Sequence, residues 1–131
     1  MKLPDHLFVG VDGHLHDLRN ELWAIEPLRW GYAKFGRQFP LTPEGSIALR
    51  AAVRAQYVWP GGYQLVFTTS DGGMLCGSCV RAEYPNIALA RRMLDSNGGW
   101  LVDGCFPSNE WDTADDLQCD HCGRVICLRD E

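Results

Sequence analysis

The apolar and polar positions at the start of the chain alternate with the period of a β-strand. Residues 7–11 read Leu-Phe-Val-Gly-Val and residues 14–18 read His-Leu-His-Asp-Leu. Asp12 and Gly13 lie between the two runs, and an Asp-Gly pair readily adopts the positive φ angles of a tight turn. The pattern therefore predicts a β-hairpin. Residues 20–40 hold several aromatic side chains without a clear period, and we expect an irregular segment there.

The pattern changes to that of a helix after residue 41. Thr42 offers a hydroxyl for the N-cap, Pro43 suits the first helical position, and Glu44 places an acid near the positive end of the helix dipole. We expect this helix to run to about Gln56, before the helix-breaking Trp-Pro-Gly-Gly run at residues 59–62. Its apolar side consists of Leu49, Ala52 and Val53.

Alternation returns at residues 63–69, which read Tyr-Gln-Leu-Val-Phe-Thr-Thr and predict a strand, followed by a turn at residues 70–73. A second helix is predicted from Pro85 to about Asp95, ended by an Asn-Gly-Gly run. Ile87, Ala90 and Leu94 form its apolar side, and Arg91, Arg92 and Asp95 face away from it.

Three shorter elements complete the prediction. Residues 100–102 form a short strand, residues 105–118 an acidic loop, and residues 124–128 a final strand. The predicted fold is of the α+β class, with a small mixed or antiparallel sheet and two helices in a single domain that spans residues 1–131.

The composition of the chain limits the classes of protein to which it can belong. The chain has 131 residues, 46% of them hydrophobic and 22% charged, which is typical of one globular domain. No apolar run approaches the ~20 residues of a membrane-spanning helix, and the first residues lack the apolar segment of a signal peptide. We therefore expect a cytoplasmic protein with no membrane partner, in which clustered cysteines are more often metal ligands or catalytic groups than disulfides.

The net charge of −5 originates in the last quarter of the chain. Residues 103–131 hold two Lys+Arg against eight Asp+Glu, a net charge of −6. A phosphate backbone would be repelled there, which disfavours nucleic acid as a partner. The arginine pairs Arg50/Arg54 and Arg91/Arg92 are interpreted as solvated helix faces.

Two Cys-x-x-Cys pairs carry the clearest chemistry in the chain. Cys76 and Cys79 form the first pair, and Cys119 and Cys122 form the second. Two such pairs can bring four thiolates into a tetrahedron around Zn²⁺. The interval between them exceeds the ~15–20 residues of a short zinc ribbon, so we expect a gapped, zinc-ribbon-like knuckle site at the end of a larger domain. Closed four-sulfur coordination leaves no position for water, so the predicted Zn²⁺ is structural.

The first pair has an alternative interpretation. A dithiol between a strand and a helix resembles a thioredoxin active site, where the helix N-terminus lowers the pKa of one thiol. The chain would then be a thiol-disulfide oxidoreductase using Cys76 and Cys79, but the second pair at the same spacing favours zinc. Among the remaining candidates, Cys105 is considered as a substitute ligand, Cys127 as a small buried hydrophobe and His121 as a solvent-facing side chain.

Local catalytic motifs are missing from the sequence. It contains no P-loop, no G-x-G-x-x-G and no G-x-S-x-G. His14 and His16 resemble the His-x-His opening of metal-dependent amidohydrolases, but those enzymes are barrels of ~250 residues. We interpret both histidines as outward side chains of the hairpin and expect a protein that is not an enzyme.

Several stretches read together suggest a relationship. Residues 49–81 contain Trp-Pro-Gly-Gly-Tyr, Ser-Asp-Gly and the first cysteine pair, and residues 98–105 and 117–126 add Gly-Gly-Trp-Leu-Val-Asp-Gly-Cys and Cys-Asp-His-Cys-Gly. With residues 12–19 and 27–32, they resemble a family of small uncharacterised proteins carried by bacteriophages, plasmids and other mobile elements. The resemblance covers most of the chain. It implies a mobile-element origin and the cytoplasm of a bacterial host, and it supplies no catalytic residues.

We expect the protein to act by binding another protein. Accessory genes of mobile elements often encode inhibitors of host machinery or host defence, so an anti-CRISPR-like inhibitor of a host protein is the leading hypothesis. Clustered acids around an aromatic side chain favour a basic partner, such as a nucleic-acid-binding protein. A nucleic-acid-binding zinc protein is an alternative, alongside the oxidoreductase. The candidate partner surface consists of Glu110, Trp111, Asp112, Asp115 and Asp116.

Overall fold

The chain forms a mixed β-sheet with helices packed against it, which is the α+β class predicted from the sequence. The structure is a computed structural model, and the residues that it describes are 3–10, 12–22, 25–36, 38–55, 57–59, 63–94, 99–108, 118–124 and 126.

The predicted N-terminal hairpin is confirmed. Strands β1 (Leu7–Gly10) and β2 (Leu15–Asp17) pair antiparallel, with Val9 opposite Leu15. Gly13 adopts a φ of 84° in the turn, and a Cβ at this position would collide with the carbonyl oxygen of Ala33. The turn therefore requires glycine for its backbone angle and for the close approach of the irregular segment that follows.

Helix α1 (Pro43–Ala55) begins where the sequence predicts. The Gly45 amide donates a hydrogen bond of 3.2 Å to Thr42 Oγ1, which confirms the N-cap. A short strand that the sequence analysis did not predict, β3 (Tyr57–Trp59), follows at once and pairs parallel with β1. Three residues carry too little pattern to reveal a strand, and pairing with β1 provides what the local sequence lacks.

Strand β4 (Tyr63–Thr69) lies at the centre of the sheet. It pairs antiparallel with β3, with β5 (Met74–Cys76) and with β6 (Val102–Pro107). Every side chain from residue 65 to residue 69 is buried, so both faces of β4 are covered rather than one. The alternation seen in the sequence therefore marks a strand here but not a solvent-facing side.

The last described strand corrects one sequence prediction. A strand was expected at residues 100–102 and a loop from Cys105 onward, but β6 begins at Val102 and includes Cys105, which lies opposite Phe67 of β4. Glycine and proline within this run weaken its strand propensity, and the ladder with β4 overrides that local preference. Of the predicted strand at residues 124–128, only residues 124 and 126 are described, and neither lies in a strand.

The second half contains two helices where the sequence analysis predicted one. Helix α2 (Gly77–Ala82) starts inside the first cysteine pair and is followed by α3 (Tyr84–Met93). Leu94 ends α3 in the left-handed conformation at φ 55°, before the Asn-Gly-Gly run expected to end it. Arg91, expected on the outward face, is buried, because it lies four residues after the core residue Ile87 on the same helix face.

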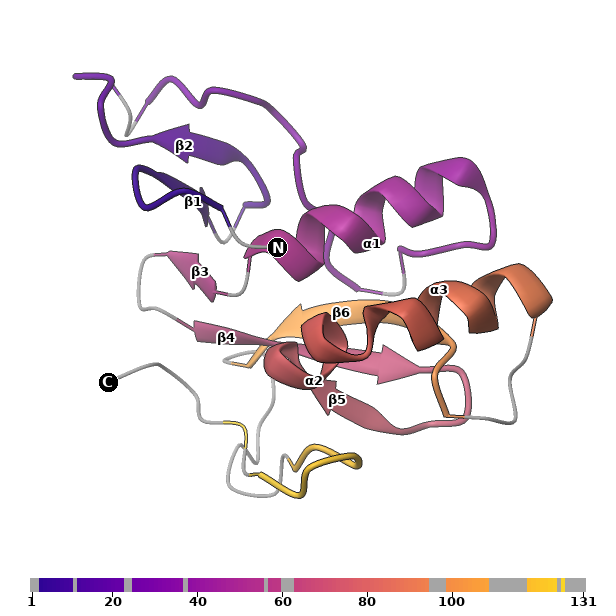
Figure 1. The fold of residues 1–131 in the computed structure, drawn as a ribbon. Helices are drawn as coiled ribbons and strands as arrows, with labels where there is room; N and C mark the ends of the chain where they lie inside the picture. Colours follow the sequence, from indigo (N-terminus) through magenta and orange to yellow (C-terminus); the bar gives the residue numbers. More distant parts are fainter. Residues whose placement is uncertain are drawn as a thin grey trace.

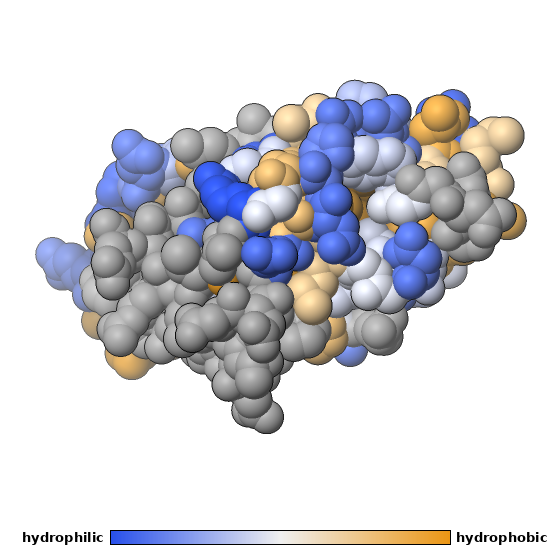
Figure 2. Space-filling view, turned by 90° about the horizontal axis from the view of Figure 1, so that it is seen from below, coloured by the Kyte–Doolittle hydropathy of each residue, from blue (hydrophilic) through white to orange (hydrophobic). Residues whose placement is uncertain are grey.

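Figure 1 shows how these elements are arranged. Helices α2 and α3 lie across β4, β5 and β6, and α2 contacts both β4 and β5. The β1–β2 hairpin and the loop around residues 118–124 lie at opposite ends of the molecule. Figure 2 views the end that carries this loop, and the part of it that is not grey holds mainly hydrophilic and intermediate residues with smaller apolar areas.

Candidate metal centre

The first cysteine pair lies where β5 passes into α2. Cys76 is the last residue of β5 and occupies the N-cap of α2 with extended backbone angles, and Cys79 lies within the helix. Both cysteines are buried, and the Cys79 carbonyl accepts a hydrogen bond of 2.8 Å from the Glu83 amide. The switch from strand to helix therefore brings two cysteines three residues apart to one side of the chain.

The second pair lies in a tight loop. The Gly123 amide donates a 2.8 Å hydrogen bond to the carbonyl of Cys119, and the Cys119 amide donates one of 2.9 Å to the carbonyl of Arg124. Gly123 adopts a φ of 74°, which a residue with a Cβ would adopt only with strain. These bonds form a tight turn at the second pair, as expected for the predicted knuckle site.

The loop is fastened to β5 by a residue that the sequence analysis did not single out. The Asp120 amide donates a 2.9 Å hydrogen bond to the carbonyl of Met74, and Asp120 Oδ2 accepts one of the same length from the Met74 amide. Asp120 thereby continues the edge of β5, and it joins two segments that are 46 residues apart. Nothing in the local sequence distinguishes this aspartate from other exposed acids.

The two pairs come together as predicted. The Sγ atoms of Cys76, Cys79, Cys119 and Cys122 all lie within 4.8 Å of one another. The sulfurs of Cys76 and Cys122 are 3.9 Å apart. A Zn²⁺ ion at ~2.3 Å from each of four tetrahedral sulfurs would separate them by about 3.8 Å. The donor set therefore fits a metal ion that prefers thiolates in a tetrahedron, and Zn²⁺ is the expected ion.

Three thiols of the cluster, those of Cys76, Cys79 and Cys119, have pKa values that depart from that of a free cysteine. Burial raises the pKa of Cys76, and burial together with neighbouring thiols raises the pKa of Cys79 further. Burial acts in the same direction on Cys119, but backbone amides directed at its sulfur, that of Cys122 first, lower its pKa to about 6. Cys119 is therefore more available to a metal as a thiolate at neutral pH than Cys76 or Cys79.

Two arginines lie beside the cluster. The Nη2 atoms of Arg81 and Arg124 lie 3.5 and 3.2 Å from the hydroxyl oxygen of Ser78, which stands between the first two cysteines. Four thiolates around a divalent cation carry a net charge of −2. The two guanidiniums, held at Ser78 between the first two cysteines, would place positive charge near that excess.

The other candidate ligands lie elsewhere. Cys105 is fully buried in β6, and its thiol contacts the Lys34 carbonyl at 3.7 Å. His121 packs edge-on against Trp100 and approaches Glu83 at 3.8 Å. Neither belongs to the cluster, so the described part of the chain offers no substitute for the four predicted ligands. Cys127 lies outside the described residues, as do the candidate partner-surface residues Glu110, Trp111, Asp112, Asp115 and Asp116.

The His-x-His run of the hairpin corrects another expectation. His16 was expected to face outward, but it is buried and stacks on Phe8 with ring centroids 4.9 Å apart. His14 Nδ1 accepts a 2.9 Å hydrogen bond from the Gly31 amide. Within the described residues these histidines belong to no group of metal ligands. His14 ties the hairpin to Trp30 and Gly31, whereas His16 packs within the hairpin.

Comparisons with known proteins add no relationship: no family model, curated protein or solved structure matches the chain. Among the described residues, no helix has both the length and the apolar character needed to cross a membrane.

Proposed function

We propose that the chain is a non-enzymatic protein-binding module whose C-terminal half is held together by a structural Zn²⁺ ion. The proposed Zn²⁺ ion rests on one observation. Four sulfurs that come from two segments far apart in sequence lie within 4.8 Å of one another. Because all four tetrahedral positions are filled by protein, no position remains for a substrate or a catalytic water.

Exposed apolar side chains support the binding part. Residues 18–30 expose five large apolar side chains by 48% or more of their surface. Exposed groups of this kind, when they are gathered together, mark interaction surfaces, and a tryptophan such as Trp30 is a frequent anchor in interfaces. In Figure 1 this segment runs past the outer side of β2, far from the cysteine loop. The five residues are Leu18, Leu22, Ile25, Leu28 and Trp30.

The partner in this proposal is a basic host protein, and the function is inhibition of host machinery or host defence in the manner of an anti-CRISPR protein. Two arguments support it: the acidic balance of residues 103–131 and the resemblance to small proteins of mobile elements. The apolar residues 18–30 would provide contact area, and the acidic residues would steer a basic partner towards the module.

The binding of a metal ion is tested by native mass spectrometry of the intact protein after growth with ample zinc. We expect the mass of one chain plus one Zn²⁺ ion. A mass of bare polypeptide, with no metal found by elemental analysis, would remove the metal from the proposal.

Protein binding is tested by affinity capture from a bacterial lysate. We expect a dominant basic protein with the unaltered chain and its loss with Ile25→Asp. Leu89→Asp is the matched control, because Leu89 is also an exposed aliphatic side chain but lies on α3. If both variants retain the same captured proteins, the apolar segment is not the binding surface.

One observation favours a second candidate, a thiol-disulfide oxidoreductase. Cys76 ends a strand and Cys79 lies in the helix that follows, which is the local arrangement of a redox dithiol. This candidate predicts thiol-dependent reduction of insulin by the purified chain. It is excluded if Zn²⁺ is bound stoichiometrically and insulin stays oxidised. A nucleic-acid-binding zinc protein, in turn, predicts retention on a DNA column with a steep dependence on salt.

A further inference from the structure

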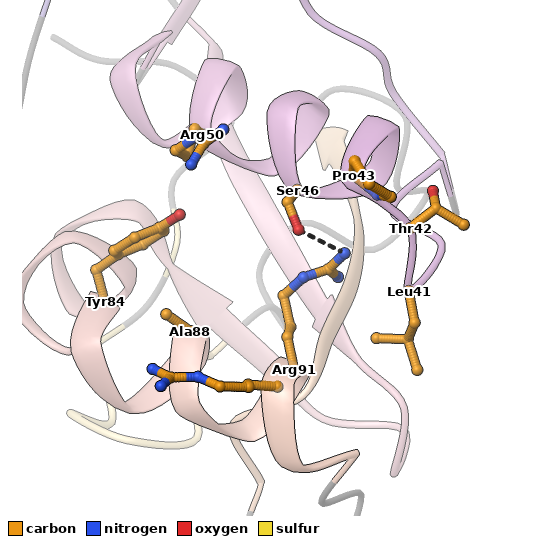
Figure 3. Close-up of a pocket in the computed structure, with 9 residues that line it drawn as sticks. Leu41, Thr42, Pro43, Ser46, Arg50, Tyr84, Ala88 and Arg91 are labelled. Carbon is orange, nitrogen blue, oxygen red and sulfur yellow. Dashed lines mark hydrogen bonds between the residues drawn. The ribbon is translucent and has the colours of Figure 1, made fainter.

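A groove lies between α1 and α3, away from the cysteine cluster. It has a volume of about 360 Å³, which falls within the range of small-molecule sites. Figure 3 shows its two walls: Ser46 and Arg50 come from α1, and Tyr84 and Arg91 come from α3. Thr42 closes one end at the start of α1.

The charge of this groove is opposite to that of the whole chain. Three arginines line it, Arg50, Arg91 and Arg92, and its lining contains no carboxylate, although the chain carries a net charge of −5. Among the described residues, no ion pair links any of these arginines to an acid. Three guanidiniums around one hollow repel one another, and an anion in the hollow would relieve that repulsion.

Arg91 gives a second indication of an anion site, independent of the number of arginines in the groove. Its side chain is buried, and its Nη atoms donate hydrogen bonds to the carbonyls of Phe39, Pro40 and Val102 at 2.6–3.3 Å and to Ser46 Oγ at 3.4 Å. Its Nε is also buried, and no described atom accepts a hydrogen bond from it. Figure 3 shows this Nε on the side of the guanidinium towards Arg50 and Tyr84. Arg91 is thus a fixed positive charge in the floor of the groove, with one donor unused.

Further groups suited to an oxyanion line the same groove. Thr42 Oγ1 accepts the Gly45 amide in the N-cap, which leaves its own proton free to donate. The positive end of the α1 dipole lies beside Thr42, at that end of the groove. Arg50 and Arg92 are exposed, and their planar guanidiniums match the geometry of a phosphate group. The ring of Tyr84 offers an apolar wall for the remainder of a ligand.

We propose that this groove binds a phosphate-bearing small molecule of mononucleotide size, with its phosphate held between Arg50 and Arg92 above the buried Arg91. Two ligands could present this phosphate group to the arginines: a nucleoside monophosphate and free inorganic phosphate. The volume of the groove and the apolar wall formed by Tyr84 favour the nucleoside monophosphate, which is the larger of the two.

The test is isothermal titration calorimetry of the full chain, purified with its metal, against AMP, inorganic phosphate and adenosine. We expect AMP to bind at least about tenfold more tightly than phosphate, and adenosine to give no signal. Equal affinity for AMP and phosphate would overturn the assignment of a larger ligand. Absence of binding by both anions at about 10 mM would overturn the site.

Variants separate a specific site from general charge attraction. Arg50→Gln and Arg92→Gln change exposed side chains, and each is expected to weaken AMP binding at least about tenfold. Arg54→Gln is the matched control, because Arg54 lies one turn further along α1 and does not line the groove. An equal loss in Arg54→Gln and Arg50→Gln would show that AMP senses only the total charge, and the proposal would fail.

Discussion

Arg91 carries a positive charge at a position that water hardly reaches. Desolvation lowers its pKa, and backbone carbonyls rather than a carboxylate satisfy its Nη donors. Those carbonyls belong to the segment before α1 and to β6, so one side chain of α3 ties together three parts of the fold. A buried cation held this way costs desolvation energy, and its hydrogen bonds offset that cost.

We expect Arg91→Met to lower the free energy of unfolding by about 2–4 kcal/mol, because three carbonyls lose their donor in a buried place. Urea unfolding followed by circular dichroism measures this. Arg92→Met on the exposed face of the same helix is the control and should change it by no more than about 0.5 kcal/mol. Equal effects of the two substitutions would contradict a tethering role for Arg91.

The thiols of the cluster give a second prediction at this scale. At pH 7.5 Cys119, with a pKa of about 6, is already a thiolate, whereas Cys76 and Cys79 have raised pKa values and keep their protons. Zinc binding must therefore release at least about two protons at pH 7.5. Below pH 6 Cys119 is protonated too, so about one more proton is released and the affinity falls more steeply as the pH is lowered.

Calorimetric titration of the metal-free chain with Zn²⁺ in buffers of different ionisation enthalpy counts these protons. Release that is the same at pH 7.5 and at pH 5.5 would contradict the low pKa of Cys119.

At the scale of elements, the candidate metal site depends on the docking of the 118–124 loop against β5. The two hydrogen bonds between Asp120 and Met74 set the position of Cys119 and Cys122 relative to Cys76, which follows Met74 by two residues. Asp120 is not a ligand. It holds the second pair at the correct distance from the first, which is how groups outside the ligand shell tune metal sites.

Asp120→Ala should therefore weaken zinc affinity by about 10–100-fold while all four thiols remain. Competition with a chromophoric chelator measures the change. Asp5→Ala removes the same charge from an exposed position near the other end of the chain and should leave the affinity unaltered. Unchanged affinity in Asp120→Ala would mean that the sulfurs alone position the loop.

At the scale of the whole molecule, the cysteines of the cluster belong to the same core as the helices and the hairpin. Cys76, Cys79 and Cys119 pack in one apolar cluster with residues as distant as Val9 and Leu49. Structural zinc binding contributes about 10–16 kcal/mol in small peptides, comparable to the stability of a whole domain. Removal of the metal should therefore loosen at least the part of the fold around the cysteine cluster.

The substitution Cys119→Ser tests whether the metal stabilises the part of the fold around the cysteine cluster. We expect loss of the bound metal, a lower melting temperature and faster amide exchange in residues 74–79 and 119–124, with little change in α1. Cys105→Ser is the control, because Cys105 lies outside the cluster and should leave metal content unaltered. Full metal content and an unchanged melting temperature in Cys119→Ser would contradict a structural role for the zinc site.

Much of the local structure follows from the sequence, for reasons visible in particular residues. The Asp12-Gly13 turn, the Thr42 cap and the alternation along β4 are local signals, and each element formed where its signal lies. Strand β3 and the true extent of β6 could not be predicted in this way. Strand β3 has only three residues and pairs with the distant β1 as well as with the adjacent β4, and β6 pairs with β4, which lies far before it in the sequence. Arg91 resembles a surface residue in the sequence, and its burial follows from contacts with the segment before α1 and with β6.

The sequence by itself determined the chemistry of the candidate metal site: four cysteines in two equal pairs are a thiolate donor set wherever the fold brings them. Only the tertiary structure decided that the pairs meet, that Cys105 stays apart in β6, and that the arginines of α1 and α3 share one groove. The physical reason is the distance along the chain over which each interaction acts. Ligand type, caps and turns depend on neighbouring residues, whereas convergence and burial depend on which distant segments the sheet and its helices bring into contact.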